Sequence, residues 1–201
     1  MNKLSWRIEV GGRCIDGAED ISHGIVRIST DVPAGVIGKI TAVLPRAMSE
    51  DERLFMNGYQ TWTYCPEYKK RDRQRGLSHL PKFLVDKYSF DRYGDYHFVD
   101  YPKKRGMFHG FSYCYFRRGE KFSLIASLDE RMRYTIFRYD SGKGNLTIER
   151  DCEGVEHKGG ELRAFDLYFA EGSEQEVFDG WFAAMGISPR TDKRIAGYSS
   201  W

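Results

Sequence analysis

The stretch GMFHGFSYCYFRRGEKFSLIASL, residues 106–128, contains two apolar and aromatic runs joined by the polar link Arg118-Gly119-Glu120. β-Branched and aromatic residues are typical of strands, and a short polar link containing Gly is typical of a tight turn. The stretch therefore predicts two successive strands, over residues 106–117 and 121–128.

Similar short runs lie on both sides of this pair. They occupy residues 4–10, 24–30, 36–44, 133–139, 145–150 and 161–170. The links between them carry turn residues, such as Gly11-Gly12 and Lys158-Gly159-Gly160. Many short strands at regular spacing, with little helix between them, favour an antiparallel sandwich. We therefore predict a mainly β domain over residues 1–172, an antiparallel β-sandwich of the supersandwich kind.

One α-helix is predicted after the strands. Ser173 and Glu176 have the spacing of a capping box, in which each side chain accepts from the other residue's backbone N–H. Val177 and Trp181 then begin an apolar helical face, and Gly186 stands where a left-handed residue would end the helix. Residues 173–194 are expected to be a connecting helix and linker. The apolar run 195–201 is expected to open a further domain.

The composition excludes several classes of function. The 201 residues carry 31 Lys and Arg against 29 Asp and Glu, so a net charge of +2 gives no global attraction to nucleic acid or anionic membranes. No apolar run approaches the roughly 20 residues that span a bilayer, and no signal peptide is recognisable. The four cysteines form no Cys-x-x-Cys pair, and no metal-binding or cofactor-binding motif occurs. We expect a cytoplasmic protein without metal or cofactor.

The segment Asn57-Gly58-Tyr59-Gln60-Thr61-Trp62 is the most informative local cluster. Amide and hydroxyl groups pair with sugar hydroxyls, while Tyr and Trp rings stack on the C–H face of a pyranose. Short strands are expected on either side of Asn57-Gly58, over 53–56 and 59–64, with this dipeptide in a turn of positive φ. The alternative is an ordinary turn with an inward Trp62. Residues 66–102, which follow, lack regular periodicity and are expected to be a functional or flexible loop.

This cluster and the C-terminal residues Gly197-Tyr198-Ser199-Ser200-Trp201 resemble segments of bacterial family 36 glycoside hydrolases, the α-galactosidase or melibiase group. The resemblance implies an N-terminal β domain, a (β/α)8 catalytic barrel whose first strand begins near residue 195, and a small C-terminal β domain. It implies retaining hydrolysis of α-galactosides by two Asp residues of the barrel. Neither has a counterpart in this chain, so we assign no catalytic residue and expect the chain alone to be inactive.

The resemblance also implies sites and partners. Trp201 matches an aromatic that lines the galactose subsite, and the 57–62 segment is a candidate for a loop at the pocket mouth. The substrate-binding candidates are therefore Asn57, Tyr59, Gln60, Trp62 and Trp201. The expected partners are the missing catalytic barrel, α-galactoside sugars and further copies of the chain in a homo-oligomer. A free-standing carbohydrate-binding module and a pure oligomerisation domain are the alternatives.

Overall fold

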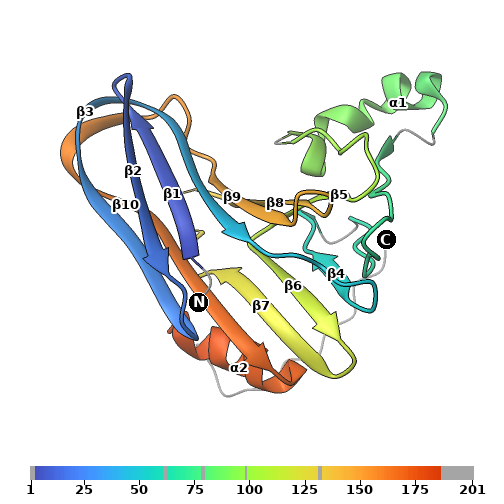
Figure 1. The fold of residues 1–201 in the computed structure, drawn as a ribbon. Coiled ribbons are helices and arrows are strands. Elements are labelled where there is room, and N and C mark those ends of the chain that lie inside the picture. The colour runs from blue at the N-terminus through green and yellow to red at the C-terminus, as the bar shows by residue number, and fades with distance from the viewer. Residues whose placement is uncertain (1–2, 61–62, 78–79, 98, 131–132, 187–201) are drawn as a thin grey trace, which may run out of the picture.

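The computed structural model describes residues 3–60, 63–77, 80–97, 99–130 and 133–186 (Figure 1). Ten antiparallel strands form one sheet. Their bounds are β1 Lys3–Val10, β2 Arg13–Asp20, β3 Gly24–Pro45, β4 Arg53–Met56, β5 Met107–Phe111, β6 Tyr113–Arg118, β7 Lys121–Ser127, β8 Thr135–Asp140, β9 Asn145–Arg150 and β10 Glu156–Gly172. The predictions of a mainly β, antiparallel domain and of a C-terminal helix are confirmed.

The prediction of a sandwich is wrong. Eight strands follow one another in the order β4-β6-β7-β10-β3-β9-β8-β5 and form a nearly closed barrel, while β1 and β2 form a hairpin that pairs with β3. The physical cause lies in β3. It is continuous over 22 residues, so its first half pairs with β10 and its second half with β1 and β9. The sheet therefore curves around instead of separating into two layers.

Two predicted interruptions lie inside strands. The predicted strands 24–30 and 36–44 leave Pro33-Ala34-Gly35 between them as a link, and Lys158-Gly159-Gly160 is predicted to be a turn. Instead the two segments lie opposite each other, with Ala34 paired to Lys158 in the β3–β10 ladder. Gly35 also meets the β1–β2 turn, where an added Cβ would lie 2.7 Å from the Cα of Gly11. These glycines thus allow close backbone approach rather than a break.

The predicted strand 106–117 is divided at Ser112. Its φ of 64° is in the left-handed region, which is uncommon for a residue other than glycine. The Ser112 N–H donates to Thr135 O at 2.9 Å, and its carbonyl accepts from Ser127 N at 2.7 Å. This kink directs β5 toward β8 and β6 toward β7, at opposite ends of the strand order.

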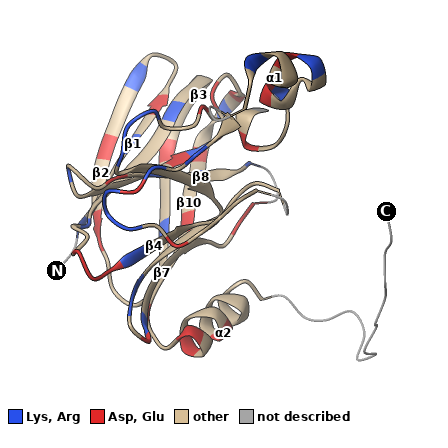
Figure 2. Ribbon diagram, turned by 90° about the vertical axis from the view of Figure 1, so that its right-hand side faces the viewer, with Lys and Arg blue, Asp and Glu red and all other residues tan. Residues whose placement is uncertain are grey.

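The core fills the inside of the curved sheet. It is rich in aromatic and branched aliphatic side chains that are at most 1% exposed, among them Leu4, Ile8, Ile28, Leu54, Phe108, Phe116, Phe137, Tyr139 and Phe165. These residues come from both halves of the strand order, so one cluster holds the two ends of the barrel together. Charged residues of both signs are distributed along the strands (Figure 2).

Helix α2, Glu174–Ala184, packs on β7 and β10 beneath the sheet (Figure 1). The predicted capping box is present: Ser173 N donates to Glu176 Oε2 at 2.8 Å, and Ser173 Oγ accepts from Glu176 N at 3.4 Å. Gly186 has the expected positive φ of 64°. Val177 and Trp181 are buried against the barrel, whereas Phe182 of the same helix is 51% exposed.

The irregular region 66–102 contains a short helix α1, Lys82–Tyr88, and two 3-10 turns, η2 Phe90–Arg92 and η3 Gly94–His97. Figure 1 shows α1 apart from the sheet, and no residue of α1 is buried. In the part of the chain that the structure describes, no helix is long and apolar enough to cross a membrane. All four cysteines are free thiols.

Candidate functional site

Asn57 closes the barrel between β4 and the β5–β6 kink. Its N–H donates to Tyr113 O at 3.3 Å, its carbonyl accepts from Phe111 N at 2.7 Å, and its side-chain amide donates to Phe111 O at 3.0 Å. Both the backbone and the amide of Asn57 are therefore occupied by the fold. A sugar-binding role for this residue stays a prediction.

The described residues after Asn57, 58–60 and 63–64, form a bend and not a strand. Neither Asn57 nor Gly58 has a positive φ, so the predicted turn geometry is wrong here. Glycine is needed for space instead, since a Cβ on Gly58 would lie 2.4 Å from the side chain of Thr63. The backbone folds tightly on itself, and Thr63 N donates to Gln60 O at 2.9 Å.

Tyr59 and Gln60 are half-buried beside this bend. The Tyr59 ring contacts Phe111 and Tyr134 edge-on, and the two tyrosine hydroxyls lie 3.0 Å apart. The hydrogen bond to Tyr134 raises the pKa of Tyr59. The side-chain oxygen of Gln60 is buried and has no hydrogen-bond donor among the described residues. Trp62 and Trp201, the other two predicted site residues, lie outside the described residues.

A buried carboxylate, Asp95, holds the bend in place. Its Oδ1 accepts from Tyr59 N and Thr63 Oγ1, each at 3.0 Å. Its Oδ2 lies 3.3 Å from both the Tyr101 hydroxyl and His109 Nε2. Burial would raise the pKa of Asp95, but the bonds from His109, Tyr59 and Thr63 outweigh it and hold this pKa below its usual value. Asp95 thus remains ionised and fixes two points of the bend.

His109 is held as firmly as the carboxylate that it contacts. Its backbone N–H and carbonyl both bond the side-chain amide of Gln74, at 2.7 and 2.8 Å, and its side chain is fully buried. The Tyr101 ring stands edge-on to the imidazole, with 4.6 Å between centroids. A fully buried imidazole held in this way is an ordinary core side chain and not a sugar contact, although Nδ1 has no partner among the described residues.

The sequence did not point to this network. Asp95, Gln74 and Tyr101 lie in the irregular region, up to 36 residues from the groups that they bond. No local spacing links them to residues 57–63, and only the folded chain brings them together. A buried acid inside a region with many exposed charges gives no periodic signal.

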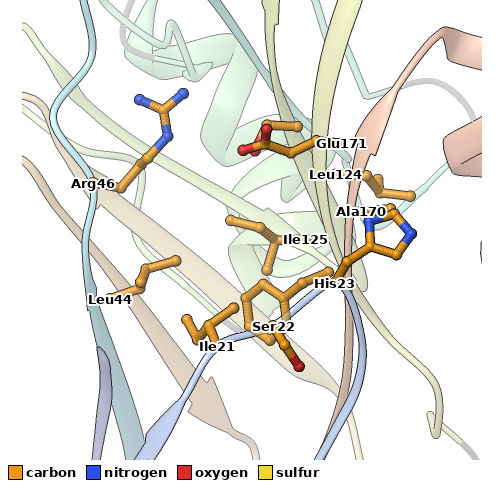
Figure 3. A pocket seen from close by; sticks show the side chains of 11 residues that line it. Ile21, Ser22, His23, Leu44, Arg46, Leu124, Ile125, Ala170 and Glu171 are labelled. Atoms are coloured by element: carbon orange, nitrogen blue, oxygen red, sulfur yellow. The ribbon is translucent and has the colours of Figure 1, made fainter. Parts of the chain in front are cut away.

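A separate hollow of about 340 Å³ opens between β3, β7 and β10. Figure 3 shows Leu44 and Ile125 inside it and Arg46 at its edge. The Arg46 guanidinium donates to Glu52 at 2.6 Å and lies 4.4 Å above the Phe116 ring, so it is already engaged. None of the predicted site residues that the structure describes, Asn57, Tyr59 and Gln60, lines this hollow, so we do not assign it to them.

A second hollow, of about 420 Å³, adjoins the end of the bend at Tyr64. Three arginines and two carboxylates are part of its lining, and it is considered below. Among the described residues, no group of three His, Cys, Asp or Glu side chains could hold a metal ion. The chain matches no protein-family model, no curated protein and no solved structure.

Proposed function

We propose that this chain is the non-catalytic β domain of an α-galactosidase-like glycoside hydrolase. In this proposal it supports a catalytic barrel, and residues 57–64 help to shape the access of α-galactosides to that barrel. The observation that carries the proposal is the anchoring of the bend: Asn57 ties it to the barrel, and Asp95 ties it at Tyr59 and Thr63.

Rigid anchoring favours recognition because a preorganised segment loses little conformational entropy when it binds. The bend also offers an exposed aromatic group, whereas the Gln60 side-chain oxygen is buried and is not open to a ligand. Tyr64, at the far end, is 77% exposed and presents an aromatic ring to solvent. The proposed substrate class, α-galactosides, comes from the resemblance of residues 57–62 to a segment of α-galactosidases.

We expect the purified chain to bind raffinose and galactose with millimolar dissociation constants and to leave nitrophenyl α-galactoside unhydrolysed. A dissociation constant of 1 mM corresponds to about 4 kcal/mol, which suits a part of a larger sugar site. Tryptophan fluorescence measures the binding, and release of nitrophenol measures the turnover. Trp62→Ala should abolish saturable binding without changing the unfolding midpoint.

His23→Ala is the matched control, because His23 is exposed and lines the separate hollow. Turnover by the chain would contradict a non-catalytic role. Micromolar binding would favour a free-standing carbohydrate-binding module. Absence of binding would reject the sugar contact and leave a scaffold or an oligomerisation domain.

One observation favours a contact with another protein surface. The segment containing α1 and η2 buries none of its residues and exposes four aromatic side chains, Phe83 (67%), Tyr88 (52%), Phe90 (41%) and Tyr93 (63%). Contiguous exposed aromatic residues mark interaction sites on soluble proteins. We propose that this segment contacts another copy of the chain, in line with the expected homo-oligomer.

The double variant Phe83→Ser/Tyr88→Ser is expected to shift the protein toward monomer in light scattering, because it removes apolar area from that contact. Met107→Ser is the control, since Met107 is exposed on β5 outside the segment. A parent chain that is monomeric at high concentration, or an unchanged oligomer in the double variant, would contradict the contact.

A further inference from the structure

The hollow beside Tyr64 gathers three arginines around a concave surface. Its lining is Tyr64, Pro66, Glu67, Tyr68, Asp72, Arg73, Arg75 and Arg105. The arginines come from two segments, 73–75 and 105, which are far apart in sequence. Its volume of about 420 Å³ is within the range of small-molecule sites. We call it the arginine hollow.

The two carboxylates of the arginine hollow are already engaged. Glu67 Oε1 accepts from Arg117 Nε at 2.6 Å and from the Tyr115 hydroxyl at 3.2 Å, and Oε2 accepts from the Arg117 guanidinium as well. These bonds from Arg117 hold the pKa of Glu67 below its usual value. Asp72 Oδ2 accepts from Lys69 N at 2.8 Å. Neither acid is paired with an arginine of the hollow.

The three arginines have no such partners. No ion pair or hydrogen bond joins the side chains of Arg73, Arg75 or Arg105 to any residue that the structure describes, and all three are exposed. A single exposed arginine is usually just solvated. Three arginines without an ion-pair partner on one concave surface raise the local positive potential, although Glu67 and Asp72 also line it.

A neighbouring hollow extends this positive surface. It shares Arg105 and is also lined by four further cationic residues, Lys70, Arg71, Lys104 and Lys143, with Asp140 as its one acid. Asp140 Oδ1 accepts from the N–H groups of Gly142 and Lys143. The two hollows together have seven cationic and three acidic side chains, a net charge of +4. The whole chain has +2, so its positive charge is concentrated here and the remainder is net negative.

We propose that the arginine hollow binds a tetrahedral oxyanion, the phosphate or sulfate group of a small ligand. The guanidinium group is planar and presents paired N–H donors that match such oxygens bidentately. Tyr64, which is 77% exposed at the edge of the hollow, would contact the uncharged part of the ligand. The oxyanion site itself does not depend on the proposed galactoside function, whereas the choice of galactose esters as probes rests on it.

Calorimetric titration at low ionic strength tests the site. The probes are inorganic phosphate, inorganic sulfate, galactose 6-phosphate, galactose 6-sulfate and galactose itself as the neutral control. We expect both sugar esters to bind more tightly than the inorganic ions and added KCl to weaken all anion binding. The tighter ester identifies whether the natural ligand is phosphorylated or sulfated.

Variants then locate the site. Arg73→Gln and Arg105→Gln should each weaken ester binding about tenfold, the value of one lost charged hydrogen bond. Arg13→Gln, an exposed arginine on β2, is the matched control and should bind like the parent. Equal binding by all three variants would overturn the site. Binding of oligonucleotides or heparin without binding of either ester would also overturn the site, because it would indicate a diffuse surface for polyanions. The anion titrations test the arginine hollow, and the galactose titration tests the sugar contact, so failure of one proposal can be told from failure of the other.

Discussion

Replacing Asp95 with Ala is expected to lower the free energy of unfolding by about 3 kcal/mol at pH 7, because several buried donors lose their acceptor together. The carboxylate accepts from Tyr59 N, Thr63 Oγ1 and the Tyr101 hydroxyl, and it contacts His109. Asp95 itself is 3% exposed, so water cannot readily replace these bonds. Urea unfolding followed by circular dichroism measures the change.

Two comparisons separate the carboxylate from other effects. Asp95→Asn keeps one acceptor oxygen and the shape of the side chain, so it should cost less than Ala. Asp100→Ala removes an exposed acid five residues away and should change stability by no more than about 0.5 kcal/mol. If Asp95→Ala were as mild as Asp100→Ala, the carboxylate would not be an anchor of the bend.

The loss of unfolding free energy on replacing Asp95 should also depend on pH. The folded state lowers the pKa of this carboxyl, so the ionised form is favoured on folding. Its contribution is complete above the unfolded pKa of about 3.9 and is lost as pH falls through the lower folded pKa. The difference in stability between parent and Asp95→Asn should therefore shrink below about pH 4. A difference that stays constant down to pH 3 would show that ionisation is not involved.

Local patterns predicted most strands because those signals are carried by neighbouring residues. In β1, for example, Leu4, Ile8 and Val10 are buried as the alternation indicates, and Ser5 and Arg7 are exposed. The capping box of α2 was predictable in the same way, because Ser173 and Glu176 lie within four residues of each other. The positions of most strands and the final helix therefore followed from the sequence, whereas the number of strands did not.

Closure of the barrel did not follow from the sequence, because it depends on distant partners. The kink at Ser112 is held by Thr135 and Ser127, and Asn57 bridges a gap of more than 50 residues to Phe111. A serine in the left-handed region has no reliable local signature. The pattern of strands along the sequence is compatible with both a sandwich and a barrel, and these tertiary bonds decide between them.

The candidate site was predictable only in part, for the same reason. The 57–62 segment attracted attention by its composition, yet its anchor Asp95 comes from a region with no periodicity. Amide and aromatic residues also serve structure: Asn57 bonds the barrel and Tyr59 packs on Phe111. Composition suggested a sugar-facing surface but could not separate anchoring groups from groups that remain available to a ligand.

Trp181→Ala is expected to cost about 3–5 kcal/mol of unfolding free energy, the usual range for removing a large buried aromatic. Trp181 is 7% exposed and lies in a cluster with Phe122 and Tyr168 between α2 and the barrel. The centroid of its ring lies 5.0 Å from the centroid of the Tyr113 ring, and its Nε1 donates to Ser127 O at 3.0 Å. The substitution removes both the packing and the bond.

The adjacent residue of the same helix provides the control. Phe182 is 51% exposed, so Phe182→Ala should cost less than about 1 kcal/mol even though the two rings stack. Trp181→Phe keeps most of the apolar area but loses the bond to Ser127 O, for an expected cost of about 1–2 kcal/mol. Because α2 buries its Trp181 face on β7 and β10, the helix is part of this barrel's own stability. If Trp181→Ala cost as little as Phe182→Ala, less than about 1 kcal/mol, α2 would be held weakly by this barrel and would need another surface to cover it.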